Sequence, residues 1–203
     1  MTGLVVGFDL DMTLIDARPG VIASFDALNA ELGTTIDGEA IASRLGPPLE
    51  REMAALFSAD EVDAVCDRYR AIYVEHGPVG SSLLPGAAEA VASVRDRGGT
   101  TLVITAKFEP NAHLCLAHVG IEVDHVIGWR HGPQKGETLL DHGAHAYVGD
   151  TVPDIEAAHL AHAHAVGVAT GPVSADELRT AGAHTVMRTL LEFPAWLDGF
   201  TPA

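Results

Sequence analysis

Apolar residues along the chain form two patterns, which predict a sheet and a separate group of helices. Short apolar runs typical of buried strands lie at residues 4–8, 101–104, 123–127, 146–148 and 165–169, with a weaker run at 185–187. From about residue 85 onward, stretches with helical spacing separate these runs. Strands that alternate with helices predict right-handed crossovers and a mainly parallel sheet covered on both faces.

The stretch between residues 17 and 80 has helical patterns and no strand-like run. Its apolar positions recur at helical spacing within residues 22–32, 49–57 and 62–76. Pro19 and Gly33 stand where the first of these helices should begin and end. We therefore expect an α/β, Rossmann-like core at residues 1–15 and 83–203, and a small all-helical domain at residues 16–82.

Composition and charge exclude several classes of protein. The 203 residues are 47% hydrophobic and 20% charged, which is typical of a globular chain. Lys and Arg number 12 against 28 Asp and Glu, so the net charge of -16 argues against binding to nucleic acid or anionic membranes. Without a signal peptide or a long apolar run, the expected location is cytoplasmic. Cys66 and Cys115 fall in separate predicted helices, so no disulfide is expected. Monomer and homodimer both remain open.

Polar residues follow three of the predicted strands and one intervening loop. In chain order they are Asp9, Asp11, Thr105, Lys135, Asp150 and Asp154. Lys135 is expected in a loop rich in Gly and Pro, just before a helix. Because the carboxyl ends of parallel strands share one edge of the sheet, where ligands bind, we expect these side chains to converge there.

Such a set matches the needs of phosphoryl transfer. A carboxylate can act as the nucleophile, and Asp9 is placed for that role. Asp11 can protonate a leaving alcohol and then deprotonate the attacking water. Mg²⁺ prefers oxygen ligands, so Asp9, Asp150 and a backbone carbonyl would suffice to bind it. Lys135 and Thr105 would stabilise the charge on the phosphoryl group.

At this point the sequence resembles a known family. The segment DLDMT at 9–13, Thr105, Lys135 and the segment GDTVPD at 149–154 resemble the four ordered motifs of the haloacid dehalogenase superfamily. The helical stretch after the first motif is similar to the mobile cap of the subgroup that contains phosphoglycolate phosphatase and β-phosphoglucomutase. One departure is Met12, where the family often has Gly.

The resemblance implies a role for each motif residue. Asp9 would be the nucleophile, and Asp11 would be the acid/base that also gives the metal its main-chain carbonyl. Asp150 would be the carboxylate ligand of Mg²⁺, and Asp154 a supporting acid that is outside the metal shell or paired with Lys135. Dehalogenases and phosphonate-cleaving members lack the second motif acid, so its presence indicates phosphate-ester or anhydride chemistry.

The expected activity is a Mg²⁺-dependent phosphatase that acts on a small phosphorylated metabolite, phosphoglycolate-like, through an aspartyl-phosphate. One alternative is a phosphomutase of the β-phosphoglucomutase type, and another is a nucleotide or pyrophosphate phosphatase. A non-catalytic binding protein would be expected to lose a motif acid, and here none is lost.

Several further residues are candidates, and some of them have two interpretations. Thr13 and Ala106 are expected as supporting or substrate-binding groups. Arg44 either binds a second anionic group of the substrate or is an exposed arginine at a helix end. Lys107 either screens the phosphate or faces water. The remaining candidates are Trp129, which either approaches substrate or packs, and His159, His162 and His164, for which a metal site is the less favoured interpretation.

Overall fold

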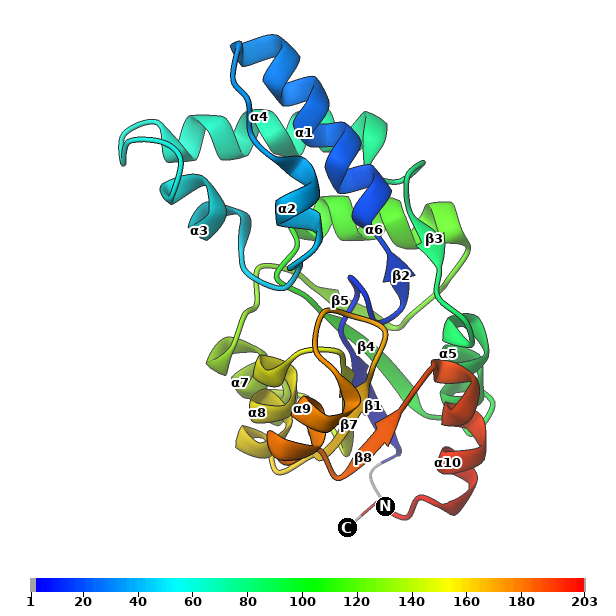
Figure 1. The fold of residues 1–203 in the computed structure, drawn as a ribbon. Helices are drawn as coiled ribbons and strands as arrows, with labels where there is room; N and C mark the ends of the chain where they lie inside the picture. Colours follow the sequence, from blue (N-terminus) through cyan, green and yellow to red (C-terminus); the bar gives the residue numbers. More distant parts are fainter. Residues whose placement is uncertain (1–2, 203) are drawn as a thin grey trace.

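Six parallel strands form the central sheet of the computed structural model, which describes residues 3–202 (Figure 1). Their order is β5-β4-β1-β6-β7-β8, and every neighbouring pair is parallel. The strands are β1 (Val5–Phe8), β4 (Thr100–Ile104), β5 (His125–Ile127), β6 (Ala146–Gly149), β7 (His164–Val168) and β8 (Thr185–Met187). The α/β class predicted from the sequence is confirmed.

Helices cover both faces of this sheet, which is why its strands are apolar on both sides. Alternate residues of one strand enter different clusters: Val103 packs on one face, while Leu102 and Ile104 pack on the other. The first face is covered by α5 (Ala87–Arg95), α6 (Glu109–Val119), η1 (Leu190–Glu192) and α10 (Phe193–Gly199). The second is covered by α7 (Pro133–Asp141), α8 (Val152–Leu160) and α9 (Ala175–Thr180).

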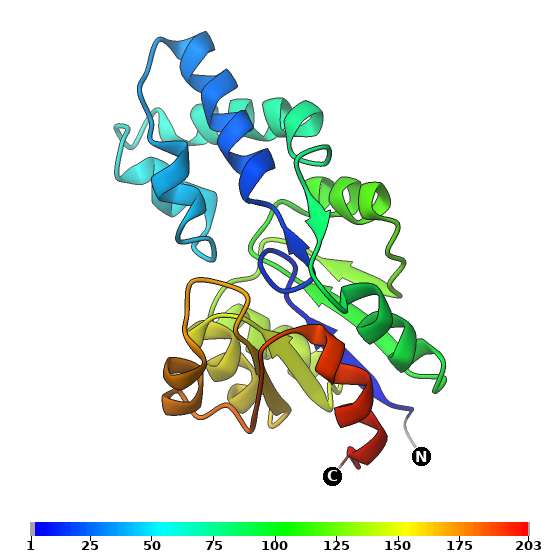
Figure 2. The same ribbon diagram turned by 45° about the vertical axis from the view of Figure 1, so that its right-hand side comes forward.

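Four helices between β2 and β3 form a separate group beyond the carboxyl edge of the sheet (Figure 2). They are α1 (Arg18–Leu32), α2 (Gly38–Ala42), α3 (Leu49–Ala54) and α4 (Val62–His76), and we call residues 17–81 the helical segment. Its helices α1 and α4 pack through Phe25 and Tyr69, whose rings are 4.6 Å apart. The patterns predicted α1, α3 and α4, whereas the five-residue helix α2 is too short to show a period.

Two short antiparallel strands connect the helical segment to the sheet domain. They are β2 (Ile15–Asp16) and β3 (Ser82–Leu83), and their two-residue pairing gave no signal in the sequence. Glycines pack closely beside them: a Cβ atom on Gly80 would lie 2.4 Å from the Cα atom of Gly20. The two connections between the helical segment and the sheet domain therefore pack against each other.

The structure corrects two local predictions. Lys135 lies in the first turn of α7, because that helix begins at Pro133, and not in the loop before it. His162 lies beyond the end of α8 with a φ of 56°, so it does not share a helix face with His159. Both cysteines are free and buried, as expected. Within residues 3–202, no helix has the length and apolar character needed to span a membrane.

Candidate active site

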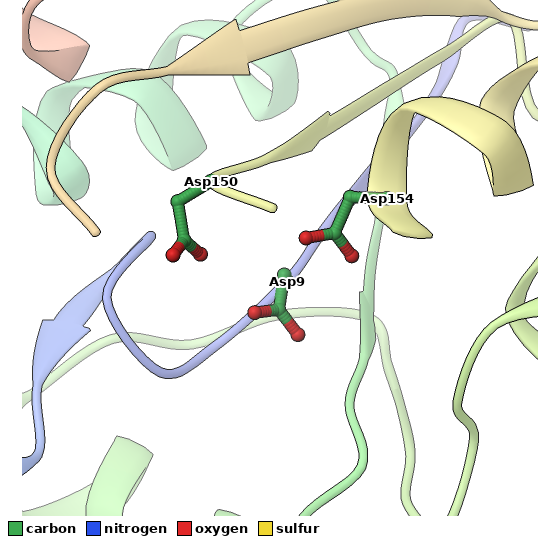
Figure 3. Close-up of side chains that lie close together, drawn as sticks. All are labelled: Asp9, Asp150 and Asp154. Carbon is green, nitrogen blue, oxygen red and sulfur yellow. The ribbon is translucent and has the colours of Figure 1, made fainter. Parts of the chain in front are cut away.

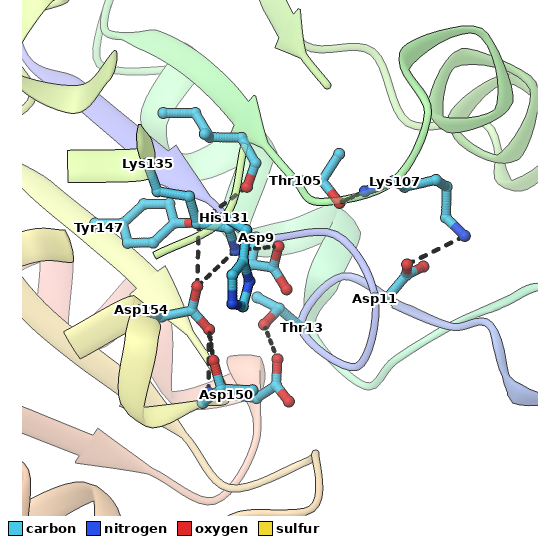
Figure 4. A network of polar contacts seen from close by, with 12 residues as sticks. Asp9, Asp11, Thr13, Thr105, Lys107, His131, Lys135, Tyr147, Asp150 and Asp154 are labelled. Carbon is cyan, nitrogen blue, oxygen red and sulfur yellow. Dashed lines mark hydrogen bonds and ion pairs between the residues drawn. The ribbon is translucent and has the colours of Figure 1, made fainter. Parts of the chain in front are cut away.

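The carboxyl ends of three neighbouring strands bring the predicted polar residues together (Figure 4). Asp9 follows β1, Thr105 follows β4 and Asp150 follows β6, in the order β4-β1-β6 across the sheet. The first turns of α7 and α8 add Lys135 and Asp154 from the side. The site is thus built on rigid elements and not on long loops.

A buried lysine joins two of the carboxylates. The Nζ atom of Lys135 lies 2.7 Å from Asp9 Oδ1 and 2.7 Å from Asp154 Oδ1. Burial alone would lower the pKa of Lys135, but the charges of Asp154 and Asp9 outweigh it and raise that pKa well above its usual value. Burial, together with the charges of Asp154 and Asp11, raises the pKa of Asp9 to about 7, although Lys135 opposes the shift.

Asp154 has both of its carboxylate oxygens engaged. Oδ1 accepts from Lys135, while Oδ2 accepts from the Thr151 amide at 3.1 Å and the Thr151 hydroxyl at 2.5 Å. These last contacts form the capping box at the start of α8. Asp154 thus caps the start of α8 and also pairs with Lys135, and that pair is one of the two roles that the resemblance implied.

Asp150 is fully buried and has one free oxygen. Its Oδ1 accepts from the Thr13 hydroxyl at 2.8 Å, and its Oδ2 has no hydrogen-bond partner. Burial and the neighbouring charges of Asp9 and Asp154 raise the pKa of Asp150 well above its ordinary value. A free carboxylate oxygen buried among other carboxylates is the setting in which a cation would lower the free energy.

The carboxylates of Asp9, Asp150 and Asp154 meet closely enough to bind a metal ion (Figure 3). One oxygen from each lies within 4.8 Å of the others. Three carboxylates share one ammonium group, that of Lys135, and their crowding adds to burial in raising the pKa values of Asp9 and Asp150. Since Asp154 is already satisfied, Asp9 and the free oxygen of Asp150 fit a divalent cation best. The side chain of Asp11 is not part of this group.

Asp11 instead pairs with a second buried lysine. Its Oδ2 lies 3.1 Å from Nζ of Lys107, which also donates to the Tyr73 hydroxyl at 2.9 Å. Burial would lower the pKa of Lys107, but the charge of Asp11 outweighs it, and the pKa is raised well above normal. The other oxygen, Asp11 Oδ1, has no partner. Of the two interpretations of Lys107, the one in which it faces water is wrong, because its side chain is 9% exposed.

Thr105 and the residue after it border the same space. Thr105 is 1% exposed, and its hydroxyl oxygen accepts from the Lys107 amide at 3.2 Å. Its own hydroxyl hydrogen is therefore left to donate to a ligand. Ala106 lies beside it on the wall of the cavity.

A cavity separates this polar edge from the helical segment. Asp9, Asp11 and Lys135 line its floor, and residues of α1, α3 and α4 line the opposite wall. Arg44 is not among its lining residues: its side chain is half exposed and pairs with Glu52 at 2.6 Å. The arginine on the wall is Arg70, which the sequence analysis missed because nothing in the pattern of α4 distinguishes it from a solvated charge.

The histidines singled out in the sequence have other partners. His159 Nε2 contacts the Gly182 carbonyl at 2.9 Å, and His164 Nε2 contacts the Thr185 hydroxyl at 2.9 Å. Over the described part of the chain, the carboxylate cluster is the group with metal-ligand spacing, and it contains no histidine.

Met12 occupies a backbone conformation that favours glycine. Its φ is 63°, and its side chain is buried. The Met12 amide donates to the Ile15 carbonyl at 2.7 Å, and its own carbonyl accepts from the Thr170 hydroxyl at 2.6 Å. These bonds and the burial of the side chain offset a conformational cost of about 1 kcal/mol.

Fold and site together define an α/β protein with a cluster of carboxylates at the carboxyl edge of a parallel sheet. A profile of the haloacid dehalogenase-like hydrolase family matches residues 6–135. The chain belongs to this family. Several of its relatives are named as phosphatases.

Individual relatives cover the chain to different extents. "Probable phosphatase IndB" from Dickeya dadantii is 31% identical over 95% of this chain and 92% of its own length. A phosphoglycolate phosphatase from Haemophilus influenzae is 25% identical over 82% of this chain and 86% of its own. The tyrosine-protein kinase PtkA of Mycobacterium tuberculosis is 33% identical over 58% of this chain, which spans only 41% of PtkA. The chain therefore covers about two fifths of the PtkA relatives.

Solved structures agree on the fold. A haloacid dehalogenase-like family hydrolase from Streptococcus pneumoniae has a TM-score of 0.80 and 23% identity, covering 97% of this chain and all of its own. At that identity the likeness supports the architecture, including the presence of helices outside the sheet domain.

Proposed function

We propose that this protein is a Mg²⁺-dependent phosphatase that hydrolyses a small phosphorylated metabolite through an aspartyl-phosphate on Asp9, in the cytoplasm. The observation that carries the proposal is the pairing of two carboxylates with different partners at one cavity floor. Asp9 pairs with Lys135 in the carboxylate cluster, whereas Asp11 pairs with Lys107 and keeps Oδ1 free. Different surroundings for neighbouring acids suit a division into nucleophile and acid/base.

In the first step Asp9 attacks phosphorus and the ester oxygen leaves. Lys135 orients the Asp9 carboxylate through its 2.7 Å contact, and the Thr105 hydroxyl donates to a phosphoryl oxygen. Asp11 Oδ1 gives a proton to the departing alcohol oxygen. Lys107 keeps the other oxygen of Asp11 engaged, so that Oδ1 is the one presented to the leaving group.

In the second step water attacks the aspartyl-phosphate. Asp11, having lost its proton to the alcohol, now takes one from this water through the same oxygen. The P–O bond to Asp9 breaks, inorganic phosphate leaves, and Asp9 is regenerated. Splitting one displacement into two lowers the barrier of each.

Asp9 and Asp150 would hold Mg²⁺, with Asp11 supplying its main-chain carbonyl. Thr13 fixes Asp150, and Asp154 fixes Lys135. When bound, Mg²⁺ neutralises charge on the phosphoryl oxygens and on the clustered carboxylates.

Residues 16–82, which include the helical segment, are proposed to act as a mobile cap on a core formed by residues 1–15 and 83–203. The β2–β3 pair would be its hinge, since both connections pass through it. Closure would exclude water from the aspartyl-phosphate until the alcohol has left. Tyr73 of α4 contacts Lys107, so closure also completes the surroundings of Asp11.

Phosphate release with Mg²⁺ tests the proposal. Asp9→Asn should lower kcat for glycerol phosphate by at least about a thousandfold, because the amide is a poor nucleophile. Glu75→Asn, an exposed change on α4, is the matched control and should keep wild-type kcat. Unchanged turnover in folded Asp9→Asn would remove Asp9 from the nucleophile's role. Isomerisation of a sugar phosphate without phosphate release would favour the mutase instead.

A further inference from the structure

The cavity between the sheet edge and the helical segment has a distal wall unlike its polar floor. Five aromatic rings line it, including two of the chain's three tyrosines and one of its two tryptophans. They are Phe25, Tyr69 and Tyr73 of the helical segment, and Phe108 and Trp129 of the sheet domain. The wall is completed by aliphatic side chains from the helical segment, among them Leu45 and Leu49.

The rings face the cavity from both sides. Phe25 and Tyr69 lie with ring centroids 4.6 Å apart, and Phe108 and Trp129 with centroids 4.9 Å apart. Trp129 is 51% exposed, and its backbone is left-handed with a φ of 53°. The Arg70 guanidinium lies over the Trp129 ring, 5.3 Å from its centroid, so a flat group would stack on the part of this half-exposed ring that Arg70 leaves open.

Among the described residues, every cationic side chain that lines the cavity has an acidic partner, so none is free for a second anionic group on the substrate. The lining Lys and Arg side chains are Arg70, Lys107 and Lys135, and each has an acidic partner, although Nε of Arg70 makes no hydrogen bond. Arg70 contacts Glu50 and also lies 2.9 Å from Asp67. Burial and the charge of Lys135 lower the pKa of His131, which disfavours the charged form of its ring.

Two acids of the wall border the cavity. Glu50 and Glu52 both line it, and Arg70 and Arg44 are their respective ion-pair partners. A carboxylate or second phosphate on the leaving group would lie beside these two acids. Like charges at short range oppose binding in a partly buried site.

One buried acceptor on the wall has no hydrogen-bond donor. Asn111, 3% exposed, directs its Nδ2 to the Arg70 carbonyl at 3.3 Å. That contact fixes the amide orientation and leaves Oδ1 buried without a partner. A buried acceptor that lacks a partner is costly, and a hydroxyl or N–H group on a ligand would satisfy it.

Resting on the phosphatase function proposed above, we propose that the leaving group of the substrate is an uncharged planar ring that carries a hydrogen-bond donor. The ring stacks between the aromatic side chains, and the donor bonds Asn111 Oδ1. Phosphoglycolate, whose leaving group is small and carries a carboxylate, is then a poor substrate, in contrast to what the names of several relatives state for those proteins.

The test is a panel of phosphate esters with similar alcohol leaving groups. It comprises benzyl phosphate, benzyl phosphates with a hydroxymethyl group at each ring position, 4-carboxybenzyl phosphate, phosphoglycolate and glycerol phosphate. We expect kcat/KM for benzyl phosphate to exceed that for phosphoglycolate by at least about tenfold. At least one hydroxymethyl isomer should be about fivefold better still, and the carboxybenzyl ester about tenfold worse than benzyl phosphate.

Two variants separate the contributions of charge and hydrogen bonding. Asn111→Leu, similar in volume, should abolish the preference for the hydroxymethyl isomer over benzyl phosphate. Glu50→Gln leaves Arg70 with fewer acidic partners and should raise the ratio of phosphoglycolate to benzyl phosphate kcat/KM by about fivefold. The matched control is Glu75→Gln, an exposed residue of α4 away from the cavity, which should leave that ratio unchanged.

The outcomes distinguish this inference from the function on which it rests. Phosphoglycolate turned over faster than every benzyl ester, with Asp9→Asn abolishing both, would overturn the ring preference and leave the phosphatase intact. Equal rates for benzyl phosphate and all its hydroxymethyl isomers would contradict the proposed hydrogen bond from the leaving group to Asn111 Oδ1. Release of no phosphate from any ester with Mg²⁺ would overturn both proposals.

Discussion

The free oxygen of Asp150 depends on a glycine in a neighbouring loop. A Cβ atom on Gly171 would lie 1.7 Å from Asp150 Oδ2, so no larger residue fits without displacing that carboxylate. The same loop contributes Thr170, whose hydroxyl donates to the Met12 carbonyl. Residues after β7 thus border the proposed metal site on a side where no sequence motif was noted.

Gly171→Ala should therefore impair metal binding. We expect the Mg²⁺ concentration at half-maximal activity to rise by at least about tenfold, because Asp150 must move away from the cluster. The measurement is phosphate release as a function of Mg²⁺ concentration. Gly199→Ala, where an added Cβ meets nothing within 4 Å, is the control and should keep the wild-type value. Equal Mg²⁺ dependence in the two variants would remove Asp150 Oδ2 from the proposed ligand set.

At the residue scale, the sequence predicted which side chains lie at one edge and allowed for the Lys135–Asp154 pair, but it missed the partner of Asp11. Asp9, Thr105 and Asp150 share that edge because alternating strands and helices make the strands parallel. The pairing of Asp11 with Lys107 could not be predicted without knowing that Tyr73 of α4 contacts that lysine. Arg70 was missed for the same reason, since a buried arginine and a solvated one look alike in a helical pattern.

At the scale of elements, one carboxylate joins the starts of two neighbouring strands. Asp124, before β5, accepts from the Thr101 amide at 2.7 Å and the Thr101 hydroxyl at 2.8 Å in β4. Hydrogen bonds from the Thr101 backbone and side chain hold the pKa of Asp124 below its ordinary value. The ionised form is therefore favoured by folding.

A pH-dependent loss of stability follows. A lowered folded-state pKa stabilises the fold above the pKa of the unfolded chain, near 4, and this contribution disappears as pH falls through the folded value. Asp124→Asn should lower the free energy of unfolding by about 1 kcal/mol at pH 7, a figure reduced because the residue is exposed.

Urea unfolding at pH 7 and pH 3 measures this contribution. The difference between Asp124→Asn and the wild type should be present at pH 7 and largely absent at pH 3. Asp26→Asn, an exposed change on α1, is the control and should match the wild type at both values. A deficit of equal size at both pH values would show that the charge of Asp124 is not its cause.

The elements that the sequence predicted are those that lie in an apolar run or show a helical period. All six strands of the sheet gave apolar runs, and α1 has its predicted proline and left-handed Gly33 at its two ends. By contrast β2, β3 and α2 have two to five residues, and their existence depends on the tertiary arrangement at the base and wall of the helical segment. The sequence pattern therefore predicts the main strands and helices but not such short elements.

At the scale of the whole molecule, two parts meet at one cavity with different chemistry. The sheet domain supplies carboxylates, Lys107 and Lys135 at the floor, while the helical segment supplies much of the apolar wall. We infer that the sheet domain determines the reaction and that the wall determines which leaving groups the site accepts. The net charge of -16 makes such local cations necessary for an anionic ester to bind.

The central claim is that the phosphoryl group passes through Asp9. The most direct measurement mixes the enzyme with Mg²⁺ and a turned-over ester, quenches in acid, and reduces the acyl phosphate with borohydride before peptide mass spectrometry. The account predicts conversion of Asp9 to homoserine, dependent on both ester and Mg²⁺. Homoserine at another aspartate, or none under conditions in which a known aspartyl-phosphate is trapped, would contradict it.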